Sequence, residues 1–571
     1  MKMIKRTTAF ALGLVMMGGA ASFAQSLADA KKAIDAEQYQ KATSMLKTLV
    51  GSQSKDGEVY FNLGKIYLAI DEVDSAKAIF TQGTIGAPKS ALNHVGLGHV
   101  EMYANNAAGA KAHFDKAIEL GKKDHVTYMN IGRAYFEVPK PDYEAALPNL
   151  QKADELESKD RDPEVFIALG DYWAAQTKNG PAYEQYLRAT DIDPNIKRVR
   201  VQIGSMFKEA DGFAEAEAEV NKALAIDPNY GPAYRELAEI QNRWSFRDAA
   251  LSKAKREESL KNYRKYMDLT DKSFDSRFRY VQFLAYAQDW TTLASELSTL
   301  KADAANPKSF VVNRLQGYSA VENEKYDIAV KSLNELFAKP ENASRIVGGD
   351  YLYLGRAYQG AGNDSLALIN MIKGVTADTT KAEALAVLGK KLYDSRKFEQ
   401  AATAYETAIN LNSRNPNRPM NYYYLGRSAY FHYAYADQAG TNPDKAILVK
   451  ADSALSKVNQ LVPEYEGAYL DRARVAKLMD SADAPTGLAI PHYLKFVELV
   501  TVTKPEKAAA NTKNLVDVYN QLAGFYANTE KDKAVEFLNK TLALDPQNAW
   551  ATQTLKILNT PTPAPKKAPI K

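Results

Sequence analysis

The chain has 571 residues, of which 73 are Lys or Arg, 69 are Asp or Glu and none is Cys. Without cysteine it can form no disulfide, thiolate metal site or cysteine nucleophile, and no cysteine can carry a lipid. The near balance of charge gives no reason to expect a nucleic acid as partner.

The first 24 residues have the pattern of a secretory signal peptide. Three basic residues among the first six precede an apolar run over residues 9–21, and Ser22-Phe23-Ala24 is a small-x-small cleavage site. We expect cleavage after Ala24 and export to the periplasm. The apolar run is shorter than the roughly 18 residues that a spanning helix needs, and no later stretch approaches that length. We therefore expect no transmembrane or lipid anchor.

Residues 166–228 hold two copies of one pattern, and the matched positions are 34 residues apart. The copies are Leu169-Gly170, Ala182, Tyr186, Ala189 and Asp193-Pro194, followed by Ile203-Gly204, Ala216, Val220, Ala223 and Asp227-Pro228. A fixed period of this size indicates a stacked array of helical hairpins. Gly and Ala let two antiparallel helices approach closely, and the larger side chains fill the seam between them. Proline then ends the second helix.

This order resembles the tetratricopeptide repeat (TPR), whose signature has Leu-Gly in the first helix, Ala and an aromatic in the second, and a closing Pro. The resemblance implies an all-α, right-handed superhelical solenoid in which each hairpin contacts its neighbours. Laid along the chain, the pattern gives about fourteen hairpins, with a short C-terminal capping helix over residues 548–558. Together with the signal peptide, it is typical of an exported bacterial TPR protein.

Changes in the rhythm of the repeats divide the chain. Charged and aromatic residues run from Trp244 to Met267 without Gly or Pro, which predicts lengthened helices at a seam between two blocks. The tail is rich in Pro and Lys, and we expect it to be extended and disordered. The expected segments are the signal peptide 1–24, a first block 25–240, the seam 241–272, a second block 273–463, degenerate hairpins with the capping helix 464–559, and the tail 560–571.

A search for chemistry finds little. The chain lacks the glycine-rich phosphate loops, the Gly-x-Ser-x-Gly turn and the His-Glu-x-x-His motif of common enzyme classes. His94, His99, His113 and His125 lie within about one hairpin, but no acidic residue accompanies them at ligand spacing. We therefore expect no catalytic residues, no cofactor and no metal site.

In the TPR family the first helix of each hairpin lines a concave groove, and the residue after the signature glycine points into it. The resemblance therefore implies one inner position in each of twelve hairpins. These positions are Lys65, His99, Arg133, Asp171, Ser205, Glu239, Gln282, Tyr318, Arg356, Lys390, Arg427 and Arg474. The last four are all basic.

Tyrosines accompany these late cations. Tyr393 and Tyr430 lie three residues after Lys390 and Arg427, and Tyr423 lies one helical turn before Arg427. Cations interleaved with rings can hold an extended, acidic peptide by charge-assisted hydrogen bonds and stacking. In the alternative interpretation, each arginine only pairs with a carboxylate of the adjacent hairpin. The predicted partner-binding strip is Arg356, Lys390, Tyr393, Tyr423, Arg427, Tyr430 and Arg474.

These patterns favour a non-catalytic periplasmic scaffold or adaptor that binds protein partners of a cell-envelope assembly along its concave face. The alternative is a glycan- or peptidoglycan-binding module that uses the tyrosine-rich segment 422–435. Runs of aromatic residues cannot all face the core of a helical hairpin, so some of these phenols should be exposed. The repeats alone do not decide between the two, because one fold can serve many functions.

Overall fold

The computed structural model describes residues 26–157, 159, 161–300, 308–412, 414–481 and 484–560. Within these ranges every regular element is helical and none is a strand, which confirms the all-α prediction. The chain forms two compact units that divide between Lys301 and Ala302, and we describe them separately as unit 1 and unit 2. The predicted signal peptide and residues 561–571 of the predicted tail lie outside the described residues.

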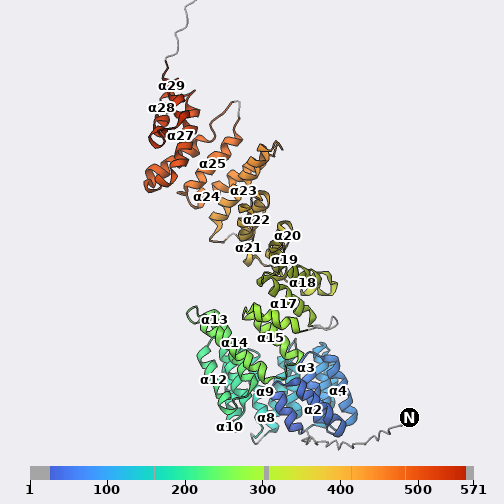
Figure 1. The fold of residues 1–571 in the computed structure, drawn as a ribbon. Coiled ribbons are helices and arrows are strands. Elements are labelled where there is room, and N and C mark those ends of the chain that lie inside the picture. Colours follow the sequence, from blue (N-terminus) through green and yellow to red (C-terminus); the bar gives the residue numbers. More distant parts are fainter. Residues whose placement is uncertain are drawn as a thin grey trace, which may run out of the picture. The chain divides into compact units, whose positions relative to one another are not determined.

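The helices of unit 1 pair as consecutive antiparallel hairpins (Figure 1). In chain order they are α1 (Leu27–Asp35), α2 (Tyr39–Ser52), α3 (Gly57–Ala69), α4 (Val73–Gly86), α5 (Leu92–Tyr103), α6 (Ala107–Leu120), α7 (His125–Phe136), α8 (Tyr143–Leu156), α9 (Pro163–Ala174), α10 (Asn179–Ile192), α11 (Lys197–Glu209), α12 (Phe213–Ile226), α13 (Gly231–Arg247), α14 (Ser252–Leu269), α15 (Phe274–Tyr286) and α16 (Trp290–Thr299).

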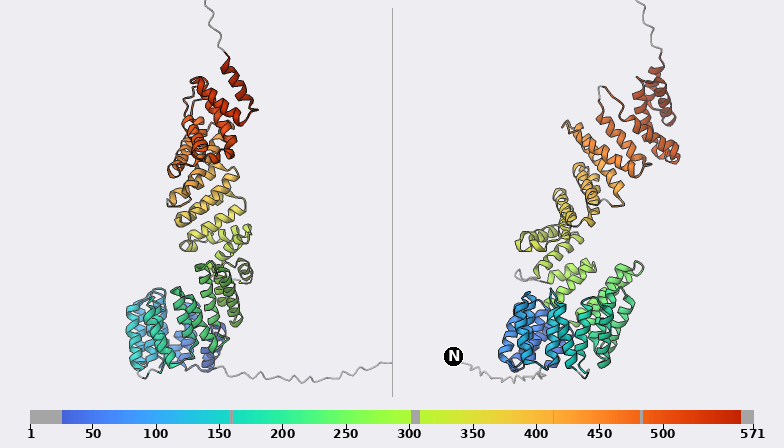
Figure 2. Two further views of the ribbon diagram at one scale, coloured as in Figure 1. Left: turned by 90° about the vertical axis from the view of Figure 1, so that its left-hand side faces the viewer. Right: turned by 180° about the vertical axis from the view of Figure 1, so that it is seen from behind.

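Unit 2 continues the same arrangement, and its hairpins follow one another in chain order (Figure 2). Its elements are α17 (Ser309–Glu322), α18 (Tyr326–Ala338), η1 (Pro340–Arg345), α19 (Gly348–Gly360), α20 (Asp364–Ala377), η2 (Thr379–Lys381), α21 (Glu383–Asp394), α22 (Phe398–Leu411), α23 (Arg418–Gln438), α24 (Ala446–Leu461), α25 (Glu466–Met479), α26 (Ile490–Glu498), η3 (Leu499–Thr503), η4 (Pro505–Lys507), η5 (Ala509–Asn511), α27 (Thr512–Tyr526), α28 (Lys531–Leu544) and α29 (Ala549–Asn559).

In many of the hairpins, a glycine of the first helix packs against a large side chain of the second helix. A Cβ atom on Gly170 in α9 would lie 2.4 Å from the ring of Tyr186 in α10. Gly64 in α3 stands in the same relation to Phe80 in α4, at 2.2 Å. Both rings are buried, and any side chain at the glycine would push the helices apart. Since the ring follows its glycine by 16 residues in both hairpins, local sequence determines this seam.

The predicted capping helix is present as α29, which packs against α28. Ala551 of α29 is buried, and Leu555 and Leu558 contact the core of the last hairpins. This confirms that a short helix covers the last hairpin within the described residues, as expected for the end of a stack whose last apolar face would otherwise meet water.

The segment without Gly or Pro, residues 244–267, holds the end of α13 and most of α14, two long helices of 17 and 18 residues. The two helices pack against each other, and α14 buries Tyr263 and Tyr266. Both helices belong to unit 1, so the boundary between the two compact units lies after this segment.

The first hairpin of unit 1 contacts helices that lie some 200 residues later in the chain (Figure 1). Gln38 donates its side-chain Nε2–H to the carbonyl of Leu269 at 2.9 Å, and the backbone N–H of Gln40 donates to Asp271 Oδ2 at 2.7 Å. Tyr230 donates its hydroxyl to Asp35 at 3.4 Å. Through these contacts the first hairpin, α1–α2, meets the ends of α13 and α14, so that the hairpins from α1 to α14 form a closed ring. We call this contact the closure of unit 1.

Glu37, in the turn between α1 and α2, is the ion at the centre of this closure. Arg235 donates to its two oxygens at 3.2 and 3.1 Å, and Tyr266 donates its hydroxyl at 2.7 Å. Arg279 lies 3.8 Å away. Burial acts to raise the pKa of Glu37, but Arg235 and Arg279 outweigh it and hold the pKa below its usual value.

The Glu37→Gln variant should open the closure of unit 1. Loss of the charge weakens the hydrogen bonds from Arg235 and removes the ion pair with Arg279. We therefore expect amide exchange in α1 and α2 at pH 7 to correspond to about 2 kcal/mol less stability, or roughly 30-fold faster exchange. Hydrogen–deuterium exchange with mass spectrometry measures this.

The pH dependence of that difference follows from the pKa of Glu37. The lowered pKa means that the stabilisation is complete above the usual carboxyl pKa of 4.5 and is lost as the pH falls through the lower folded value. The wild type and the variant should therefore converge in acid. Glu119→Gln, at a side chain that is 67% exposed, is the matched control and should change exchange little. Equal exchange of the Glu37→Gln variant and the wild type at pH 7 would rule out this account of the closure.

Candidate functional site

The first helices of the unit 1 hairpins surround a cavity of about 960 Å³. Its lining comes from α1, α3, α5, α7, α9, α11 and α13. The amide side chains of Asn62, Asn130 and Gln202 lie among its lining residues. Asn62 and Asn130 donate to backbone carbonyls one turn earlier in their own helices, at 2.9 and 2.8 Å. Their Oδ1 atoms remain as acceptors.

An ion network connects to this cavity through Gln202. Arg133 lies 3.1 Å from Asp171 and donates to Glu137 at 2.9 Å. Asp171 also accepts hydrogen bonds from the Tyr186 hydroxyl at 2.9 Å and from Gln202 Nε2 at 2.6 Å. Burial acts to raise the pKa of Glu137, but Arg133 and the other nearby cations outweigh it and lower the pKa to about 2. Arg133 and Asp171, both predicted inner positions, therefore neutralise each other.

Lys65 has a different environment from the other cations of the cavity. Among the residues that the structure describes, it has no ion-pair or hydrogen-bond partner, and its Nζ lies 5.8 Å from the centroid of the Phe61 ring. Burial lowers the pKa of Lys65, against the opposing attraction of Glu137. The other lining cations are paired: Lys31 with Glu58, Lys32 with Asp29, Arg198 with Glu164 and Arg235 with Glu37.

In unit 2, each cation of the predicted strip has a carboxylate partner. Arg356 lies 2.7 Å from Glu322 of the preceding hairpin, and Lys390 lies 2.6 Å from Asp394 in its own helix. Arg427 and Arg474 lie 3.3 and 2.9 Å from the same carboxylate, Asp471. This is the pairing that the alternative interpretation predicts for Arg356 and Arg427. It leaves these four residues less free to bind an acidic peptide.

The structure brings three residues of the predicted strip together around Arg427. Its guanidinium carbon lies 5.5 Å from the ring centroid of Tyr393 and 5.4 Å from that of Tyr423. Tyr430 is half-buried and contacts Phe431, with 5.0 Å between ring centroids. Arg356 belongs to a separate group with Glu322 and Tyr353. The strip is thus not one continuous surface but a set of separate clusters, in each of which the cation pairs with a neighbouring carboxylate.

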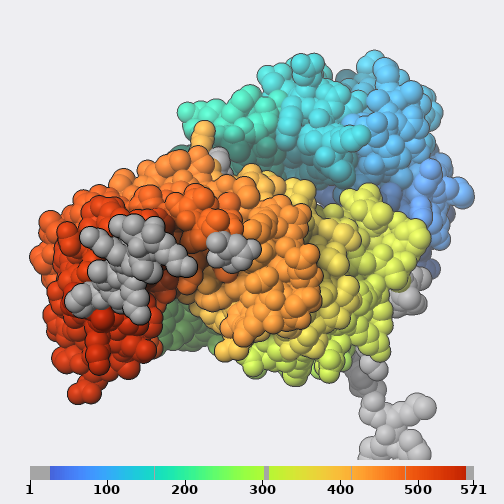
Figure 3. Space-filling view, turned by 90° about the horizontal axis from the view of Figure 1, so that it is seen from above, coloured from blue at the N-terminus to red at the C-terminus, as the bar shows by residue number. Residues whose placement is uncertain are grey.

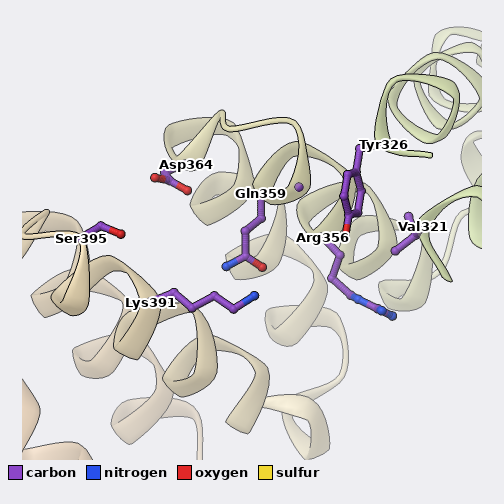
Figure 4. A pocket seen from close by; sticks show the side chains of 8 residues that line it. Val321, Tyr326, Arg356, Gln359, Asp364, Lys391 and Ser395 are labelled. Carbon is purple, nitrogen blue, oxygen red and sulfur yellow. The ribbon is translucent and has the colours of Figure 1, made fainter. Parts of the chain in front are cut away.

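A smaller cavity of about 340 Å³ lies beside Arg356 in unit 2 (Figure 4). Gln359, Asp364 and Lys391 contribute to its lining. Asp364 pairs with Lys397, and the Nε2 of Gln359 is buried without a hydrogen-bond partner. Figure 4 shows the guanidinium of Arg356 turned away from Lys391, so the two cations do not converge on one point.

Two of the histidines form hydrogen bonds through their rings. His99 Nε2 lies 3.1 Å from the carbonyl of Glu137, and His125 Nε2 lies 2.9 Å from Asp162. Within the described ranges, no group of three or more His, Asp or Glu side chains is arranged to hold a metal ion.

Sequence analysis placed Lys65 at an inner position but did not distinguish it from the other cations there. Arg198 and Gln202 were not predicted, although they precede the inner position Ser205 by seven and three residues. The helical period could have placed both on the same face. Glu37 gave no comparable signal, because its partners are about 200 residues away in the sequence.

The pairing in unit 2 predicts different effects at two positions of the strip. Arg427→Ala leaves the carboxylate of Asp471, which is 5% exposed, with one cation fewer, so we expect a loss of about 2 kcal/mol in the stability of unit 2. Lys390→Ala removes only an exposed pair within one helix and should cost less than about 0.5 kcal/mol. Urea denaturation followed by tryptophan fluorescence measures both, in chains where Trp173, Trp244 and Trp290 of unit 1 are replaced by Phe so that Trp550 reports unit 2. Equal losses in the two variants would contradict the assignment of Arg427 to a structural cluster.

Comparison with known proteins places one of these hairpins in a family. Residues 57–84 match the family model described as a tetratricopeptide repeat. The chain is 27% identical over 124 residues to a DnaJ homolog subfamily C member 7 homolog of Dictyostelium discoideum. It is 28% identical over 135 residues to a probable UDP-N-acetylglucosamine–peptide N-acetylglucosaminyltransferase, SPINDLY, of Solanum lycopersicum. These similarities cover 21% and 24% of this chain but only 22% and 14% of those proteins.

Solved structures of TPR proteins are also similar. The C-terminal part of a TPR repeat-containing protein from Cytophaga hutchinsonii is 29% identical, with 49% of this chain and 99% of that chain covered and a TM-score of 0.33. YrrB, described as a TPR protein with an unusual peptide-binding site, is 22% identical, with 33% and 95% covered and a TM-score of 0.21. The family match covers residues 57–84, which hold α3 and most of α4, and several other hairpins repeat the contact between a glycine and a large side chain.

Proposed function

We propose that this protein is a non-catalytic scaffold that binds a segment of a partner protein in the cavity of unit 1. Repeat proteins of this kind use their concave surfaces for binding. The observation that carries the proposal is Lys65, a half-buried side chain in the wall of that cavity whose ammonium group has no ion-pair or hydrogen-bond partner among the described residues. A carboxylate of the partner supplies the missing charge.

The lining of the cavity suits an extended peptide backbone. Gln202 Oε1 is buried without a hydrogen-bond partner, and Asn62 and Asn130 each have a free acceptor oxygen. Backbone N–H groups of an extended chain can donate to such oxygens. The cavity volume of about 960 Å³ lies at the upper end of the range of about 300–1,000 Å³ for ligand sites.

The energetics favour one carboxylate near Lys65. Removing an ammonium group from water is costly unless the charge is compensated. A charge-assisted hydrogen bond to a carboxylate contributes about 1.5–3 kcal/mol, which corresponds to at least about a tenfold gain in affinity. The remaining lining ions are already paired, so a strongly acidic segment would gain nothing from further carboxylates. The expected ligand is a mostly neutral segment with one Asp or Glu.

The tyrosine-rich segment of unit 2 gives no comparable support for a glycan site. Tyr424 stacks on Tyr405 with 5.6 Å between ring centroids, Tyr423 contacts Tyr465 at 5.1 Å, and Tyr433 is buried. Tyr435 is exposed but stacks on Phe398 at 5.6 Å. Most of these rings therefore pack against other aromatic rings.

Lys65→Met should remove the preference of the protein for an acidic side chain. Wild-type protein, Lys65→Met and the exposed control Lys111→Met can be incubated with an array of ten-residue peptides in which each Glu-containing peptide has a Gln-containing twin. We expect the wild type and Lys111→Met to bind the Glu member about tenfold more tightly, and Lys65→Met to bind both alike. An unchanged Glu preference in Lys65→Met would refute the site. Circular dichroism should show all three proteins folded, since methionine removes a buried charge without leaving a partner unpaired.

We further propose that the scaffold acts in the periplasm, in an assembly of the cell envelope. Its support is the signal-peptide pattern of residues 1–24. No helix within the described ranges is both long and apolar enough to cross a membrane.

Expression of the full chain in a bacterium with two membranes tests this location. We expect the protein to be released with the periplasmic contents and its amino terminus, read by sequencing, to be Gln25. A full-length protein that retains Met1 in the cytoplasm would exclude the periplasmic proposal and leave the cavity of unit 1 unaffected.

A further inference from the structure

A second cavity, of about 1220 Å³, lies in unit 2 at the ends of α23, α25, α27 and α29. The insertion between α25 and α26 forms one of its walls, through Asp480, Pro485 and Gly487. Figure 3 shows the red surface of α27–α29 next to the orange surface of α24–α26, the region to which these elements belong. None of the cavity's residues belongs to the site proposed in unit 1.

Hydrogen bonds hold this insertion in place. Asp480 accepts from the backbone N–H groups of Thr486, Gly487 and Leu488, at 2.9, 2.8 and 3.1 Å, and from the Thr486 hydroxyl at 2.9 Å. These hydrogen bonds, first among them that from the Thr486 backbone, lower the pKa of Asp480. The charge of Asp480 is therefore satisfied within the wall.

The wall lies directly on an aromatic side chain of the cavity. Gly487 has a φ of +82°, and a Cβ atom there would lie 2.5 Å from the ring of Phe525. Only glycine permits both the backbone conformation and the approach. Trp550 of α29 also lines the cavity and is 45% exposed. The cavity thus offers two aromatic surfaces, from α27 and α29, that the fold does not cover completely.

The carboxylates of the cavity are less satisfied than its ammonium groups. Lys477 donates to Gln521 at 2.9 Å, and Lys445 donates to the carbonyl of Met479 at 3.5 Å. Asp437 and Asp517 are exposed and have no ion-pair or hydrogen-bond partner among the described residues. Within the described part of the chain, each lysine thus donates to one neutral acceptor only. The described lining nevertheless holds three carboxylates, those of Asp437, Asp480 and Asp517, against these two ammonium groups, so its charge favours a cation.

We propose that this cavity is a docking site for a basic, proline-containing segment of a partner protein. Proline-rich segments dock on aromatic surfaces because their extended conformation is largely preformed, so that little entropy is lost on binding. Trp550 and Phe525 receive the prolines or aliphatic side chains, and Asp437 and Asp517 receive lysine or arginine by charge-assisted hydrogen bonds. The site is independent of the peptide cavity in unit 1 and selects the opposite charge.

The chain itself contains a sequence of this chemistry, Pro561 to Lys571, with four prolines and three lysines. This sequence, as a synthetic fluorescein-labelled peptide of residues 560–571, is the probe. Two forms of the full chain are compared. One is the wild type, and the second form has Lys566→Gln, Lys567→Gln and Lys571→Gln. These changes remove the lysines from the chain's own copy of the probe sequence, so that this copy can no longer compete for the carboxylates of the cavity. Fluorescence anisotropy measures the dissociation constant.

We expect the second form to bind the probe, and the wild type to bind it more weakly, because its own residues 560–571 have the same sequence and compete for the cavity. In the second form, Asp437→Asn with Asp517→Asn should weaken binding at least about tenfold, and Trp550→Ala should weaken it to a similar extent. Asp327→Asn, an exposed carboxylate on α18, is the matched control and should have no effect. Binding should weaken as salt is raised from 50 to 500 mM, values chosen to shorten the Debye length severalfold.

Three results would overturn the proposal. The first is a dissociation constant weaker than about 1 mM for both forms, which corresponds to a binding free energy of about −4 kcal/mol. The second is binding that the Asp437 and Asp517 substitutions leave unchanged. The third is binding by the second form but not by the wild type, which would show that the chain's own C-terminal residues, and not a partner, occupy the cavity.

Discussion

The contact of a glycine in one helix with a large side chain in the next is the constraint on which the hairpins depend. At Gly170 and Tyr186 no Cβ atom fits between the helices, so the helix axes come close and the ring fills the seam. The contact recurs with Gly64 and Phe80. It sets which face of each first helix is turned away from its partner helix, and that face lines the cavity of unit 1.

Closure of unit 1 adds a second constraint, because it largely buries several ions of the inner face, among them Glu37 and Arg133. Ions in such an environment need partners. Glu37 has Arg235 and Tyr266, and Arg133 has Glu137 and Asp171. Among the lining cations, Lys65 alone lacks an ion-pair partner in the part of the chain that the structure describes, which is why we propose that a ligand supplies a carboxylate there.

Residues at equivalent positions of the repeat have different roles in the two units. Lys65, Lys390 and Arg427 each follow a signature glycine. Lys390 pairs with Asp394 within its own helix, Arg427 pairs with Asp471 of the next hairpin, and Lys65 has no such partner among the described residues. Position in the repeat therefore predicts the direction of a side chain, but the neighbouring hairpin decides whether its charge is available.

The sequence by itself determined the helical hairpins, because their seam depends on residues 16 positions apart within one hairpin. It also determined the α29 cap and the inner position of Lys65, since these follow from helical periodicity. Only the tertiary structure decided that α1–α2 reaches α13–α14 and that the predicted cations of unit 2 are neutralised. Those outcomes depend on contacts between residues far apart in the sequence, and small rotations accumulated over many hairpins determine which residues meet.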